Sequence, residues 1–173
     1  MRFIGTKIVL AIAMTRLAYN AYRGWTLPSD EVGADEGYLV EYTDGGAPNH
    51  AAHAGYISWL PKEQFDNAYR ETSGLSFGLA IEALKKGFKV ARAGWNGKGM
   101  WLVLVPGTPL AQLREGTPYH NALGLAECEI LPHIDMWTIN ASGRRAMLPG
   151  WLASQSDMLA DDWAIVDAST ADQ

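Results

Sequence analysis

Residues 92–101 concentrate side chains that could bind an anion and a flat ring. They read Arg-Ala-Gly-Trp-Asn-Gly-Lys-Gly-Met-Trp, which combines cations, indole rings and glycines. An Asn-Gly pair between two apolar runs is a strong hairpin signal, because both central residues of a type I′ turn need a positive φ. Backbone N–H groups and cations at a hairpin tip suit a phosphate, and indole rings suit a base. A plain hairpin with an aromatic core is the alternative.

A second candidate group is Ser154-Gln155-Ser156-Asp157, which has the composition of a helix N-terminus. Its first and last residues predict a capping box, in which each side chain bonds the backbone amide of the other residue. The same serine and aspartate could instead contact ribose hydroxyls or an adenine amine, and exposed helix amides could hold a phosphate. The sequence leaves both interpretations open.

Other chemistry-bearing residues form incomplete sets. The spacing of His50 and His53 can fit zinc, but nothing completes the ligand set, so a solvated loop is favoured. His133 and Asp135 alternate on one predicted strand face and could act as an acid–base pair, but no nucleophile motif accompanies them. The lone Cys128 excludes an internal disulfide. No Walker loop or dinucleotide fingerprint is present. We therefore predict no catalytic residue, no metal and no cofactor.

Composition restricts the partners. The chain has 173 residues, is 48% hydrophobic and carries a formal net charge of −5. That charge argues against DNA or RNA as a partner, because such binding needs a basic face. No apolar run reaches the ~18 residues of a membrane helix. The apolar run at residues 8–14 faintly resembles a signal peptide, but we read it as a buried strand of a cytoplasmic protein.

The order of the helices and strands that must position these residues predicts an α+β fold of two small domains, residues 1–72 and 73–173. Each should be a mostly antiparallel sheet with one or two packed helices. The first domain should contain strands at residues 3–10, 37–42 and 55–59, a helix from Thr15 to Gly24 and a helix opening at Pro61. The second should contain a helix from Ser76 to Gly87, the hairpin, short helices at 109–114 and 154–161, and strands at 129–137, 146–151 and 163–166.

Several of these segments resemble the second Thoeris anti-defence family of phage proteins. The similar motifs are Phe-Gly-Leu-Ala-Ile-Glu-Ala-Leu-Lys-Lys-Gly at 77–87, Val-Ala-Arg at 90–92, Gly-Trp-Asn-Gly-Lys at 94–98, Pro-Gly-Trp-Leu-Ala-Ser-Gln-Ser-Asp-Met-Leu-Ala at 149–160 and Asp-Trp at 162–163. The likeness covers residues 74–167. It implies a non-enzymatic sponge that sequesters bacterial immune nucleotides, with glycocyclic ADP-ribose and, for some members, cyclic oligonucleotides as ligands. It also implies a homotetramer with pockets between subunits, acting against Thoeris or CBASS defence in the cytoplasm of the infected host.

Hairpin chemistry and this likeness together predict the ligand-binding residues, which are Arg92, Trp95, Asn96, Gly97, Lys98, Ser154 and Asp157. The first domain looks like a small domain of phage proteins, without a secure function. Two alternatives from other classes remain. One is a phage enzyme that cleaves such nucleotides with His133 and Asp135, and the other is a structural or adaptor protein that uses its aromatic residues as interface anchors. An apolar run over residues 101–105 also favours a homo-oligomer, because a solvated antiparallel strand should alternate.

Overall fold

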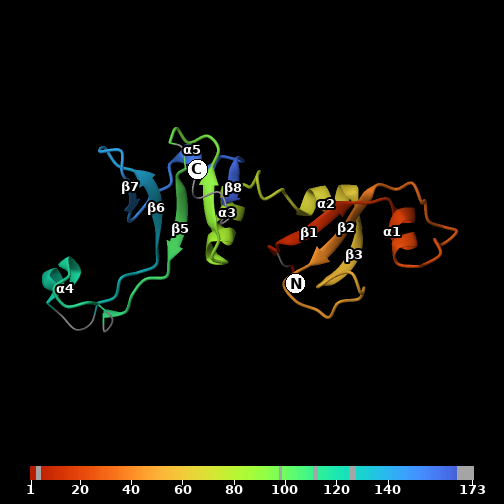
Figure 1. Cartoon of the computed structure of the whole chain (residues 1–173), viewed down its shortest axis with the longest axis horizontal. Helices are drawn as coiled ribbons and strands as arrows, with labels where there is room; N and C mark the ends of the chain where they lie inside the picture. The colour runs from red at the N-terminus through yellow and green to blue at the C-terminus, as the bar shows by residue number, and fades with distance from the viewer. Residues whose placement is uncertain (3–4, 98, 111–112, 125–127, 167–173) are drawn as a thin grey trace. The chain divides into compact units, whose positions relative to one another are not determined.

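The computed structural model describes the chain except residues 3–4, 98, 111–112, 125–127 and 167–173. The chain divides into two compact units, residues 1–70 and 71–173 (Figure 1). One unit contains a three-stranded sheet and the other a five-stranded sheet, both antiparallel and both with packed helices. The predicted α+β class is confirmed.

The N-terminal unit is a small sheet with two short helices. Its elements are β1 (Val9–Ala13), α1 (Arg16–Tyr22), β2 (Gly37–Tyr42), β3 (Tyr56–Pro61) and α2 (Lys62–Ala68), with the strands in the order β1-β2-β3. Helix α1 begins as predicted, because the Thr15 side chain accepts a hydrogen bond of 3.3 Å from the Ala18 amide. Tyr19 of α1 packs on Leu39 and Ile57 of the sheet, and these three residues form the core of the unit.

The prediction of a buried first strand is wrong. Strand β1 begins at Val9 and forms an edge of its sheet, pairing with β2 on one side. Its Leu10 and Ile12 are 59% and 60% exposed. An edge strand has a neighbour on one side only, so apolar residues on it gain less burial than their hydrophobicity suggests.

The C-terminal unit is built on the larger sheet. Its elements are α3 (Phe77–Lys85), β4 (Lys89–Arg92), β5 (Trp101–Val105), α4 (Pro118–Leu123), β6 (His133–Ile139), β7 (Arg145–Leu148), α5 (Gln155–Met158) and β8 (Trp163–Val166), with the strands in the order β7-β6-β5-β4-β8. Helix α3 packs against β4, β5, β8 and α5. Val90, Leu102 and Trp163 are fully buried beneath it.

The connection between β5 and β6 differs from the prediction. The short helix expected at residues 109–114 falls partly on residues outside the described part, and the helix of this region is α4. Proline at the first position of α4 has the φ that a helix needs, and Gly124 ends the helix with a φ of 56°. Among the described residues, no helix combines the length and the apolar character that a bilayer crossing requires.

Candidate functional site

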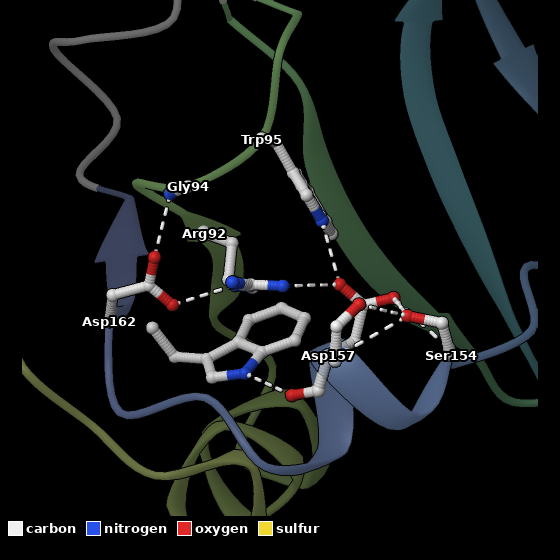
Figure 2. Close-up of polar contacts among 8 residues, drawn as sticks. Arg92, Gly94, Trp95, Ser154, Asp157 and Asp162 are labelled. Atoms are coloured by element: carbon white, nitrogen blue, oxygen red, sulfur yellow. Dashed lines mark hydrogen bonds and ion pairs between the residues drawn. The ribbon is translucent and has the colours of Figure 1, made fainter.

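Two segments that are distant in sequence meet at one end of the five-stranded sheet (Figure 2). They are the end of β4 and the stretch that runs from helix α5 to the residue before β8. Strands β4 and β8 run antiparallel with Arg92 opposite Trp163, so the last residue of β4 lies beside the first residue of β8. The predicted site residues Arg92, Trp95, Ser154 and Asp157 are brought together at this point.

The Arg92 guanidinium lies between two carboxylates (Figure 2). Its Nη1 donates to Asp157 Oδ1 at 2.9 Å, and its Nε donates to Asp162 Oδ1 at 2.7 Å. The Arg92 and Asp157 side chains are 17% and 11% exposed, whereas Asp162 is 36% exposed. One cation thus faces two anions in a partly desolvated place, which favours the charged form of all three groups.

Asp157 accepts hydrogen bonds at both of its oxygens. Besides Arg92, Oδ1 accepts from the Trp95 indole Nε1 at 3.0 Å. Oδ2 accepts from the Ser154 amide at 3.0 Å and from the Ser154 hydroxyl at 2.6 Å. The Asp157 amide donates back to Ser154 Oγ at 3.2 Å, which completes the predicted capping box at the start of α5.

These contacts shift the carboxyl groups toward ionisation. Burial alone would raise the pKa of Asp157, but the bonds from Ser154, Trp95 and Arg92 outweigh it and hold the pKa far below its ordinary value. Burial also acts against ionisation of Asp162, and the bonds from Arg92 and from the Gly94 amide overcome it and lower its pKa. Both carboxylates are therefore ionised near neutral pH and act as hydrogen-bond acceptors.

The cluster fixes the start of the loop at residues 93–100. The Gly94 amide donates to Asp162 Oδ2 at 2.7 Å. A Cβ at Gly94 would lie 2.8 Å from that oxygen, so the close approach requires glycine. Trp95 packs edge-on against Trp163 and Trp151, with ring centroids 5.4 and 6.1 Å away.

The β4–β5 connection is longer than the predicted type I′ turn. Strand β4 ends at Arg92 and β5 begins at Trp101. Neither Asn96 nor Gly97 has a positive φ, whereas Gly99 has a φ of 71°. The Asn-Gly signal therefore located the hairpin but not the turn, because the bonds of Gly94 and Trp95 to the two carboxylates widen the connection. Asn96 and Gly97 are exposed on this loop, and Lys98 lies outside the described residues.

Sequence reasoning missed Asp162 and Gly94 as partners of the predicted site. Nothing in the local pattern joins Asp162 to Arg92, which is 70 residues away. A usable signal existed, because Asp162 directly precedes a predicted strand that could pair with the strand ending at Arg92.

The two residues considered as an acid–base pair lie within ion-pair distance of each other and also have other partners. His133 Nε2 lies 3.5 Å from Asp135 Oδ1, and His133 Nδ1 contacts the Leu131 carbonyl at 2.9 Å. Asp135 is buried and accepts from the Gly150 amide at 3.1 Å. Asp135 therefore holds the chain that follows β7, and its contact with His133 is longer than a good hydrogen bond.

The histidine pair of the first unit is built into a polar network. His53 Nδ1 lies 2.8 Å from Glu41 Oε2, and its Nε2 lies 2.9 Å from the Tyr22 hydroxyl. The bond with His53 is the largest cause that lowers the pKa of Glu41. The solvated-loop interpretation is thus wrong for His53, whose side chain is 11% exposed. Within the described residues, no cluster of three His, Cys, Asp or Glu side chains is placed to hold a metal ion.

The cluster can fix and present a loop, and each of its charged groups has hydrogen-bond partners within the protein. Comparison with known proteins places it inside a recognised domain. Residues 75–166 match the model of the Thoeris anti-defense 2-like domain. The chain is also similar to "Thoeris anti-defense 2" of Bacillus phage SP01, with 37% identity over 93 residues that cover 53% of this chain and 94% of that protein. With the α+β sheet and the cluster inside the matched region, the chain belongs to the Thoeris anti-defense 2-like family, whose name implies counter-defence against Thoeris.

Proposed function

We propose that the C-terminal unit binds a cyclic nucleotide immune signal and withholds it from its effector without cleaving it. The ligands are glycocyclic ADP-ribose and, as a further class, cyclic oligonucleotides, and the place of action is the cytoplasm of the infected bacterium. The observation that carries the proposal is the cluster of Arg92, Asp157 and Asp162 within the family match. It anchors Gly94 and Trp95 at the start of a glycine-rich segment, and anchored groups lose less entropy on binding.

The loop is fixed at both of its ends. Gly94 and Trp95 are bound to Asp162 and Asp157 at its start. At its other end, the Thr138 hydroxyl donates to Met100 Sδ at 3.5 Å. The residues between these anchors include Asn96 and Gly97, which are exposed. We assign direct ligand contact to Asn96, Gly97 and Lys98, with the Trp95 ring as a wall beside them.

Arg92, Ser154 and Asp157 then act mainly as positioning residues. The charge of Arg92 is already balanced by two carboxylates, so it has little charge left for a phosphate. The Asp157 carboxylate has protein donors at both oxygens, which leaves it poorly placed to accept from a ribose. A ligand that displaced these partners would lose charge-assisted bonds of about 1.5–3 kcal/mol each.

The polar groups of the C-terminal unit suit a protein that binds a nucleotide without cleaving it. His133 and Asp135 are the residues that a nucleotide-cleaving enzyme would use. Asp135 accepts from the Gly150 amide, and His133 Nδ1 lies 2.9 Å from the Leu131 carbonyl, so both side chains have structural partners. This geometry favours a binding protein over the enzyme alternative.

A homotetramer is part of the same proposal. Leu102 points into the core under α3, so Trp101 and Val103 lie on the opposite face of the sheet. There Trp101 stacks on Trp137 across the strand pair at 5.6 Å, and Lys89 Nζ lies 5.0 Å from the Trp101 ring centroid. An aromatic face of this kind, on a sheet whose other face is filled, suits burial against another subunit.

The test is to recover the ligand after capture. The full chain is mixed with glycocyclic ADP-ribose, freed of unbound ligand by filtration, denatured and analysed by chromatography. Recovery of intact ligand supports the proposal. A cleaved product, in the protein fraction or in the filtrate, establishes the enzyme instead. Intact ligand found only in the filtrate refutes both functions for glycocyclic ADP-ribose, and the same test is then made with a cyclic oligonucleotide.

Two variants locate the site. Asn96→Ala removes an exposed amide at a position without a positive φ, so it should weaken binding while leaving the melting temperature unchanged. Asn121→Ala removes an exposed amide of α4, together with its 3.1 Å bond to the Gly116 carbonyl, and is the control for affinity. Equal affinity of Asn96→Ala and Asn121→Ala would place the ligand elsewhere.

A further inference from the structure

The N-terminal unit contains an open pocket of about 700 Å³, bounded by α1, the chain that follows it and β3. Arg16 and Tyr19 line it from α1, Arg23 and Trp25 from the following chain, and Tyr56 and Trp59 from β3. That volume lies within the range of small-molecule sites. Every residue named belongs to the first compact unit, so this pocket is separate from the cluster around Arg92.

Both arginines of the pocket have a buried N–H group without a hydrogen-bond partner. The atoms are Nε of Arg16 and Nη1 of Arg23. A buried donor that lacks an acceptor costs about 1–3 kcal/mol, so native proteins rarely leave one unused. Both atoms are covered by protein, so they show that the two guanidinium groups beside the pocket lack a full set of acceptors.

The two arginines differ in their charge balance. Arg16 Nη1 bonds Glu31 Oε2 at 2.7 Å, and Asp35 Oδ2 lies 3.8 Å from Arg16 Nε. Within the described part of the chain, no carboxylate lies at ion-pair distance from Arg23. Its guanidinium instead stacks over the Trp25 ring, 4.4 Å from the centroid. Arg23 therefore supplies a positive charge that the protein does not neutralise.

The aromatic residues of the pocket are unusually open to solvent. Trp25 is 53% exposed and Tyr56 is 46% exposed, although both rings line the pocket. Tyr19 lies beneath them, 7% exposed, with its ring edge-on to Trp25 at 6.2 Å. Exposed rings beside a cation provide a surface on which a flat ring can stack.

The wall of the pocket is also held in place. The Asn49 side chain donates to the Ile57 carbonyl at 2.9 Å and accepts from the Ile57 amide at 2.8 Å. This pair ties the chain before β3 to the strand itself. The Arg16 guanidinium stacks on Trp59 at 4.3 Å, which fixes the opposite side.

We propose that this pocket is a second ligand site, which takes a small molecule with one anionic group attached to a flat ring. The anionic group pairs with the guanidinium of Arg23, and the ring stacks beside Trp25 and Tyr56. Nucleoside monophosphates and aryl carboxylates both have this chemistry.

The experiment is NMR titration of the full chain, following the indole N–H signal of Trp25. The probes are AMP, adenosine, inorganic phosphate and indole-3-acetate. We expect AMP or indole-3-acetate to shift the Trp25 signal saturably. The probe that binds shows whether the pocket takes a phosphate or a carboxylate. Adenosine and phosphate, which each carry half of the chemistry, should bind at least tenfold more weakly than that probe. Failure of both complete probes, or adenosine or phosphate binding as tightly as the better one, overturns the proposal.

Variants separate this site from the C-terminal unit. Arg23→Gln should weaken the binding at least tenfold, and Arg70→Gln, an equal change of charge on an exposed residue of the same unit, should not. If Arg23→Gln unfolds the unit, Tyr56→Leu provides the same test through the loss of a stacking ring. Binding that persists in the folded variant, or that shifts Trp95 in place of Trp25, overturns the assignment to this pocket.

Discussion

Replacing Asp157 with asparagine should destabilise the C-terminal unit more than any comparable change around it. The amide keeps the shape of the carboxylate but turns one acceptor oxygen into a donor. Its best orientation leaves the oxygen toward Arg92 and Trp95, and the Ser154 hydroxyl then accepts from the new amide. The Ser154 backbone amide loses its acceptor in that arrangement.

The magnitude follows from these contacts. The Ser154 amide, on an exposed residue, loses a part-buried bond worth about 1 kcal/mol, and the bonds from Arg92 and Trp95 lose charge assistance worth about 1–2 kcal/mol together. We expect a loss of about 3 kcal/mol in the free energy of unfolding for Asp157→Asn. Asp162→Asn should lose about 1 kcal/mol, because Asp162 is 36% exposed and water screens its ion pair.

The assay is urea unfolding at one protein concentration, followed through the indole signal of Trp163. That residue is fully buried in this unit, so its signal reports on the C-terminal unit alone. Asp161→Asn is the matched control, because its side chain is exposed beside the cluster. An Asp157→Asn variant within about 0.5 kcal/mol of Asp161→Asn would refute the structural role assigned to the carboxylate.

Three further predictions concern the same unit. Gly94→Ala should lower the free energy of unfolding by about 1 kcal/mol in urea titration, because a Cβ 2.8 Å from Asp162 Oδ2 breaks the Gly94 bond to that oxygen. Acid should destabilise the unit, because the pKa values of Asp157 and Asp162 lie below 3.8 in the folded state. The stability that these carboxylates contribute is present above that pH and is lost as the pH falls through their folded pKa values. Thermal melts should show a smaller loss on acidification for Asp157→Asn than for the parent protein. Light scattering should find an oligomer, expected to be a tetramer, that Trp101→Ser shifts toward smaller species, whereas a monomer at every concentration would refute the assignment of the aromatic sheet face.

Local signals determined much of the secondary structure. Thr15 and Ser154 act as predicted caps, because a hydroxyl before a helix bonds amides only two or three residues away. The strand at residues 37–42 and the strand at 163–166 have the predicted bounds. The caps depend on neighbours in sequence. The residue types of the two strands were enough to locate them, although each strand bonds to partners elsewhere in the chain.

Tertiary structure alone decided what the predicted site residues do. Arg92 meets Asp157 and Asp162 only because β4 pairs with β8, and that pairing brings together residues 65 and 70 positions apart. The sequence could identify Arg92 as a cation near a glycine-rich turn, but the carboxylates that neutralise it come from another part of the chain. Likewise, Arg23 gives no sign in sequence of a buried donor without an acceptor, because that property exists only once α1 has packed beside the sheet. Residue types determined which groups could bind a ligand. Long-range packing determined which of those groups remain without a partner in the folded chain.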